Sequence, residues 1–154
     1  LRSSKPLVAG MVTEDFLKVC VWVALVGALV VSLTSPLGVQ GTAIHFLGLL
    51  SATAYNLKLK ATVFSFAPYM ISFGALPSAI YVAAGVRPPL WLVLAFVLIA
   101  SAFHFLNVLK DLELDRAQNV MGLPQVLGRN KSILVAALLL AFGVIAMALG
   151  HLRF

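Results

Sequence analysis

Apolar residues fill five long runs of this chain, and polar residues gather in the short segments between them. A helix that crosses the hydrocarbon core of a bilayer needs about 20 mainly apolar residues. We therefore predict membrane-spanning helices at about 16–35, 39–55, 62–84, 89–110 and 132–151. The second run is shorter and more polar than the others. The third contains Pro68 and Pro77, which predict kinks whose freed carbonyl groups bond to neighbouring helices.

Composition agrees with this prediction. Of the 154 residues, 62% are hydrophobic and only 10% are charged, and the mean hydropathy is +1.06. Soluble domains have about 25% charged residues. We therefore predict an all-α integral membrane protein with five transmembrane helices in a single domain, residues 1–154. The single cysteine, Cys20, cannot form an intrachain disulfide and is expected to be a small packing residue.

Charge is distributed unequally if the five helices alternate in direction. One side of the bilayer then receives all five acidic residues and nine of the eleven basic ones, and the other keeps only Arg87 and Arg153. Cytoplasmic loops carry an excess of Lys and Arg, so we predict that the charged side is cytoplasmic and carries the chemistry. The net charge of +6 does not indicate a nucleic-acid partner, because the basic residues lie in short loops that face anionic lipid or phosphate.

The sequence KDLELDR, at the end of the fourth run, concentrates charge that is rare elsewhere. Asp111 and Asp115 are four residues apart, so a helix would place them on one face, about 5–6 Å apart, with Asn107 one turn earlier. Two carboxylates this close repel each other unless a cation lies between them, and Mg²⁺ typically takes one or two carboxylates plus substrate phosphates. The alternative is a solvated helix end whose acids pair with Lys110 or Arg116.

A second basic element follows the second run. Lys58 and Lys60 lie at a membrane boundary on the same side as the aspartates, with Tyr55 and Asn56 beside them. Lysine ammonium groups can hold a phosphate as point charges. The alternative is that these lysines only anchor the helix end by the positive-inside rule.

Other candidates carry weaker signals. Glu113 would point away from the face that the two aspartates share. His45 and His104 are expected to be hydrogen-bonded core residues rather than metal ligands, and the glycines of GLPQVLG are interpreted as turn residues before the last span. Aromatic residues around the third and fourth runs could line a cavity, although most aromatic residues in membrane spans serve packing.

Three segments resemble the UbiA-type intramembrane prenyltransferases. NVLKDLELDRAQNVMGLPQVLG resembles the second aspartate motif of that family, a D-x-x-x-D at the cytoplasmic end of the sixth helix, in a form familiar from actinobacterial members. YNLKLKAT followed by SFAPYMISFGALP is similar to the segment after the fourth helix, and KPLVAGMVTEDF to the run before the third. The resemblance covers nearly the whole chain and implies a nine-helix bundle, of which the five spans are helices three to seven.

The resemblance implies a function that the residues alone do not give. It implies Mg²⁺-dependent transfer of an isoprenyl group from a polyprenyl diphosphate to an acceptor, which we expect to be aromatic, at the cytoplasmic face of a bacterial inner membrane, as in quinone biosynthesis. It assigns Mg²⁺ binding and catalysis to Asp111 and Asp115 and contact with the diphosphate to Lys60. The residues expected to support the site and the substrate are Asn107, Arg116, Tyr55 and Lys58.

The chain also departs from the family pattern. The first aspartate motif, N-D-x-x-D-x-x-x-D, is expected just before residue 1, and the last one or two helices are missing, so we expect a central fragment that is inactive alone. Tyr55 and Lys60 are one residue further apart than in the common Y-x-x-x-K, and Ala61 stands where an arginine often follows.

Two other functions remain open at this point. A transporter segment would place facing charges at mid-membrane in inverted repeats, but the charges gather at one face and the sequence contains no internal repeat. A non-catalytic membrane subunit would explain the missing first motif. The acceptor and the length of the prenyl chain have no signature in the sequence.

Overall fold

A computed structural model describes residues 6–152 of the chain, and within this range the only regular elements are helices. Five are long and correspond to the five predicted runs: α1 Glu14–Thr34, α2 Gly38–Leu57, α3 Ala67–Ala83, α4 Leu90–Leu109 and α7 Arg129–His151. Three are short: η1 Leu59–Ala61, a 3₁₀ helix, α5 Leu112–Ala117 and α6 Leu123–Leu127. The all-α prediction is therefore confirmed.

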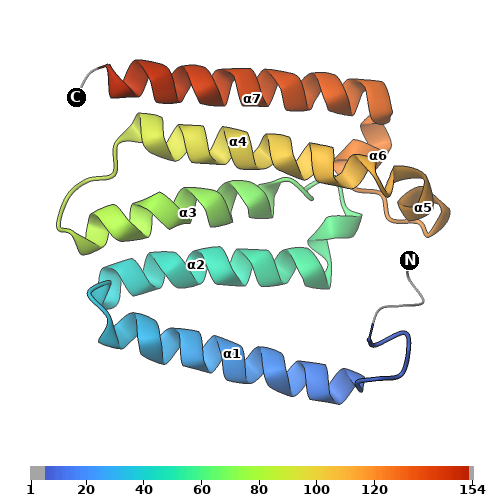
Figure 1. The fold of residues 1–154 in the computed structure, drawn as a ribbon, viewed down its shortest axis with the longest axis horizontal. Helices are drawn as coiled ribbons and strands as arrows, with labels where there is room; N and C mark the ends of the chain where they lie inside the picture. The colour runs from blue at the N-terminus through green and yellow to red at the C-terminus, as the bar shows by residue number, and fades with distance from the viewer. Residues whose placement is uncertain (1–5, 153–154) are drawn as a thin grey trace.

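The long helices lie side by side in one layer, in the order in which they occur in the chain (Figure 1). Each packs on the next, so that α1 contacts α2, α2 contacts α3, α3 contacts α4, and α4 contacts α7. Such a layer leaves apolar side chains exposed on its faces; Trp22 and Val23 of α1, for example, are 68% and 66% exposed. In a bilayer these surfaces meet lipid or other apolar helices rather than water.

Three of the helices, α1, α4 and α7, are long and apolar enough to cross a membrane, among the residues that the structure covers. The third predicted span is the least accurate, because α3 begins at Ala67 and has 17 residues. The five residues before it form turns closed by backbone bonds such as Ser65 N–H to Thr62 C=O (3.0 Å). The helix α2 has 20 residues and carries the polar side chains expected from the sequence.

Small and hydroxyl-bearing residues bring α2 and α3 together. A Cβ added to Gly48 of α2 would lie 3.3 Å from the Cβ of Ala75, and one added to Gly41 would lie 3.1 Å from the carbonyl oxygen of Ala79. The hydroxyl of Ser72 donates to the carbonyl of Gly48 (2.8 Å). Close backbone approach and bonds from hydroxyl to carbonyl are typical of helix pairs in lipid, where apolar burial between helices contributes little.

All the short helices lie at one end of the layer (Figure 1). The same end receives the beginning of α1, the end of α2, the end of α4 and the beginning of α7. It therefore collects all five acidic residues and every described basic residue except Arg87, as the alternation of five spans predicts. Arg2, Lys5 and Arg153 lie outside the described residues.

The contact between α4 and α7 depends on glycines that face large side chains. A Cβ added to Gly150 would lie 2.0 Å from Cδ2 of Trp91, and one added to Gly143 would lie 2.7 Å from Ile99. Real Cβ atoms do not approach other atoms this closely, so a larger residue at either position must displace its neighbour.

We predict that Gly150→Ala lowers the stability of the helix layer by about 1–3 kcal/mol, the usual cost of overpacking. Thermal unfolding in detergent would measure this. Gly27→Ala in α1 is the matched control, because no atom lies within 4 Å of a Cβ added there, and its effect should stay within about 1 kcal/mol. Equal unfolding temperatures for the two variants would contradict the proposed role of the glycine contact.

Candidate functional site

Two segments at the charged end of the layer enclose a cavity of about 350 Å³. One segment follows α2 and contains η1 with the turns after it, and the other follows α4 and contains α5 and α6. The cavity mixes charged, polar and apolar walls. Its lining residues are Val8, Tyr55, Lys60, Ser65, His104, Val108, Asp115, Gln118, Val120 and Gln125.

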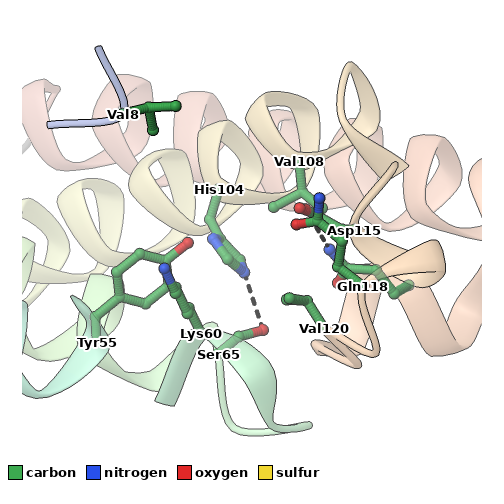
Figure 2. A pocket seen from close by; sticks show the side chains of 10 residues that line it. Val8, Tyr55, Lys60, Ser65, His104, Val108, Asp115, Gln118 and Val120 are labelled. Carbon is green, nitrogen blue, oxygen red and sulfur yellow. Dashed lines mark hydrogen bonds between the residues drawn. The ribbon is translucent and has the colours of Figure 1, made fainter. Parts of the chain in front are cut away.

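The two charged residues of the cavity come from different segments. Lys60 is in η1, and Asp115 is in α5. Figure 2 shows the side chains of Lys60 and Tyr55 on one side of the view and Asp115 on the other, with His104 between them. The cavity therefore offers an ammonium group and a carboxylate from opposite segments.

Asp115 is held by the helix that follows it. Nε2 of Gln125 in α6 donates to Oδ2 of Asp115 at 3.0 Å, and Gln125 itself is only 2% exposed. The guanidinium group of Arg116 donates to the backbone carbonyl of Gln125 through Nε (2.9 Å) and through a terminal nitrogen. Adjacent residues of α5 thus bond to both the side chain and the backbone of one glutamine, which fixes the Asp115 carboxylate relative to α6.

Ser65 lies where the two segments meet. Its hydroxyl accepts a hydrogen bond from the backbone N–H of Leu123 (3.2 Å) and pairs with Nε2 of His104 at 3.2 Å. Both Ser65 and His104 are 1% exposed. This confirms the prediction that His104 is a hydrogen-bonded core residue, and its ring also packs against Tyr69, with centroids 4.6 Å apart.

The predicted site residues divide into two groups. Lys60, Tyr55 and Asp115 line the cavity, and Arg116 supports it through Gln125. The remaining three do not line it: Asp111, Asn107 and Lys58 are all exposed.

The predicted common face of Asn107, Asp111 and Asp115 is interrupted, because α4 ends at Leu109 and a turn precedes α5. Asp111 is the residue just before α5, and the N–H of Asp115 donates to its carbonyl (2.8 Å), so the two aspartates are one helical turn apart. Glu113 is exposed, as expected, and lies 3.7 Å from the guanidinium of Arg116.

Ser65 and Gln125 are not among the site residues predicted from the sequence. Serine is a common turn residue, and Gln125 lies in a segment interpreted only as turn chemistry. The one signal available was a polar glutamine within GLPQVLG, between apolar residues next to a span, because a polar side chain in such a position usually has a partner.

A divalent metal would find few protein ligands here. The described residues contain no group of three or more His, Cys, Asp or Glu side chains able to hold a metal ion. The cavity wall supplies the carboxylate of Asp115, and Asp111 lies one turn away. This set fits Mg²⁺, which needs only one or two carboxylates when substrate phosphates supply further oxygens.

Two further, mainly apolar cavities share lining residues with the polar one or with each other. Tyr55 also lines a second cavity of about 360 Å³, and Tyr69 and Phe73 line both that cavity and a third of about 390 Å³. The third is walled almost wholly by apolar side chains of α3, α4 and α7, including Phe96 and Phe103. Aromatic side chains thus line the apolar cavities as well as part of the polar one.

Comparison with known proteins gave one match. The model of a family described as the UbiA prenyltransferase family matches residues 2–154. No curated protein and no solved structure matches the chain significantly.

We predict that Arg116→Ala weakens the attachment of α5 to α6. The substitution removes both bonds to the Gln125 carbonyl, and bonds from charged groups contribute about 1.5–3 kcal/mol each. The unfolding temperature in detergent should be clearly lower for Arg116→Ala than for the unmodified protein. Arg129→Ala is the control, because Arg129 is an exposed residue at the start of α7. An equal effect of the two substitutions would contradict the role of Arg116.

Proposed function

We propose that this chain, which belongs to the UbiA prenyltransferase family, contributes the diphosphate-binding half of an intramembrane prenyltransferase site. The reaction is the transfer of an isoprenyl group from a polyprenyl diphosphate to an aromatic acceptor, as in quinone biosynthesis. The observation that carries the proposal is the shared cavity of Lys60 and Asp115 at the charged end of the layer. Family membership implies prenyl transfer and a membrane location in general. The roles of individual residues are our proposal for this chain.

Lys60 is proposed to bind the diphosphate. Its ammonium group lines the cavity, and a positive charge there stabilises the negative charge that grows on the diphosphate as the allylic carbon–oxygen bond breaks. Tyr55 stands next to Lys60 in Figure 2 and orients towards the same space. Asn107 and Lys58 are exposed, and we assign them at most a contact with the outer part of the substrate.

Asp115 is proposed to hold Mg²⁺, with Asp111 one turn away. When bound, Mg²⁺ would supply the Lewis acidity that neutralises the leaving diphosphate. Gln125 and Arg116 keep the Asp115 carboxylate facing the cavity. The oxygens of the substrate diphosphate would supply the further ligands, because Mg²⁺ needs only one or two carboxylates from the protein.

The aromatic cavities are proposed to receive the isoprenoid. Tyr69 and Phe73 stack with ring centroids 6.1 Å apart, and their π faces can stabilise an allylic cation formed near the charged end. The apolar third cavity suits the rest of the prenyl chain, because its walls carry almost no polar groups. The charged end would face the cytoplasm of a bacterium by the positive-inside rule, where soluble diphosphates and Mg²⁺ are available.

We predict that Asp115→Asn in the complete protein reduces prenyl transfer by roughly 100-fold or more, because a neutral amide replaces the carboxylate at the centre of charge stabilisation. The assay measures incorporation of a radiolabelled isoprenyl diphosphate, with and without Mg²⁺, into a panel of hydroxylated aromatic acids in proteoliposomes. Glu113→Gln is the control, because Glu113 is an exposed carboxylate on the same short helix. Full activity of both Asp115→Asn and Asp111→Asn would sink the proposed function.

Lys60→Ala should weaken binding of the isoprenyl diphosphate by about 10- to 100-fold, the value of one hydrogen bond to a charged group. The measurement is the KM for the isoprenyl diphosphate in the same assay. Lys58→Ala is a matched control, since Lys58 lies two residues away and does not line the cavity. If the two lysine variants raise KM equally, these lysines act only as general surface charge.

A further inference from the structure

The segment that contains Lys60 (η1 and the turns after it) and the segment that contains Asp115 (α5 and α6) meet at Gly122, where a side chain would be crowded. A Cβ added to Gly122 would lie 3.0 Å from the carbonyl oxygen of Lys60, 3.0 Å from Oγ of Ser65 and 2.7 Å from Oε1 of Gln125. The backbone of Gly122 has φ −66° and ψ 167°, a conformation open to any residue. Glycine therefore avoids crowding at this position, and a larger residue would have to shift Gln125, Ser65 or the backbone of Lys60.

Tight turns connect Lys60 to this junction. The hydroxyl of Thr62 donates to the carbonyl of Leu59 (2.9 Å), and the N–H of Ser65 donates to the carbonyl of Thr62 (3.0 Å). Ser65 then bonds across to the N–H of Leu123, the first residue of α6. The position of Lys60 is thereby tied to α6.

The connection continues from α6 to the carboxylate. Gln125 lies two residues after Leu123 and donates to Oδ2 of Asp115. The first turn of α6 is also held by α7, because the hydroxyl of Ser132 donates to the carbonyl of Pro124 at 3.1 Å. His104 anchors the whole assembly to α4 through Ser65. The turns after Lys60 are thus linked through Ser65, α6 and Gln125 to the carboxylate of Asp115.

We propose that Ser65, Gly122 and Gln125 form a positioning junction that sets the separation of Lys60 and Asp115 across the cavity. None of the three needs to react with the substrate. Ser65 and Gln125 are buried residues that act through Lys60 and Asp115, and Gly122 permits the close approach. This inference rests on the proposed function in one respect, namely that the ligand bound between Lys60 and Asp115 is the diphosphate group of the substrate.

Substitutions at the junction should make the separation of the two segments more variable and should also weaken binding of the diphosphate. The variants are Ser65→Ala and Gly122→Ala in the complete protein. Nitroxide labels at positions 61 and 117, in a Cys20→Ser background, report the separation of the segments in bilayers by pulsed electron resonance. Binding of inorganic diphosphate in the presence of Mg²⁺ is measured by calorimetry on the unlabelled proteins.

We expect a broader label separation and a 10- to 100-fold weaker binding of diphosphate, the usual effect of losing a partner that orients a ligand-binding group. Ser65→Thr, which keeps the hydroxyl, should restore much of the binding. Ser101→Ala is the matched control, because Ser101 is also buried but donates only within its own helix, to Val97 (2.7 Å). Gly27→Ala is the matched control for Gly122→Ala, because no atom lies within 4 Å of a Cβ added to Gly27.

The possible outcomes separate the two proposals. Normal diphosphate binding in Lys60→Ala and Asp115→Ala would overturn the proposed function. Loss of binding in those two variants, with normal binding in Ser65→Ala and Gly122→Ala, would overturn the junction. A broadened label separation with unchanged binding would also overturn it, since the contacts would then serve only the fold.

Discussion

The hydrocarbon core of a bilayer contains no water to bond with the peptide groups, and this constraint shapes the whole structure. Each backbone N–H and C=O must find its partner within the chain, so a single segment can cross only as a helix. Irregular backbone is then confined to the ends of the helices. At one end of this layer the connections are short, residues 35–37 and 84–89, and at the other they include η1, α5 and α6. Lys60 and Asp115 lie where the chain is free to leave regular helical geometry.

Short helices do not stabilise themselves. An isolated helix of fewer than about 12–15 residues is marginal in water, and α5 and α6 have six and five residues. Their positions depend on side chains that bond to backbone groups from outside, such as Arg116 to the carbonyl of Gln125 and Ser65 to the N–H of Leu123. The polar side chains at this end therefore hold the short helices in place. The long helices need no such side chains, because their backbone groups bond within each helix.

Much of the fold could be predicted from the sequence because hydrophobic length decides it. Four of the five predicted spans agree with the long helices to within three residues at either end. The third was placed too early, because the apolar residues Val63 and Phe64 continue the hydrophobic run while the backbone forms turns held by Thr62. Hydropathy does not distinguish an apolar turn at the boundary from the first turn of a helix.

The candidate site was predictable only in part, for a related reason. Spacing along one helix identified Asp111 and Asp115, but the break after Leu109 turns the chain, and only Asp115 lines the cavity. The segments that carry Lys60 and Asp115 are joined by a bond between Ser65 and Leu123, which are 58 residues apart in the chain. Contacts of this kind depend on which helices become neighbours, and no local pattern encodes that.

Opposite charges that face each other across a cavity attract and tend to close it, and the junction of Ser65, Gly122 and Gln125 opposes this closure. Two unit charges 4 Å apart near a protein surface attract each other by about 4 kcal/mol, enough to close a cavity between mobile segments. Lys60 and Asp115 belong to short elements that could move towards each other if nothing restrained them. Ser65 and Gln125 restrain the two segments through part-buried bonds, and the missing side chain of Gly122 lets the segments approach each other closely. The same contacts that hold α6 in place would thus keep space between the charges for a ligand.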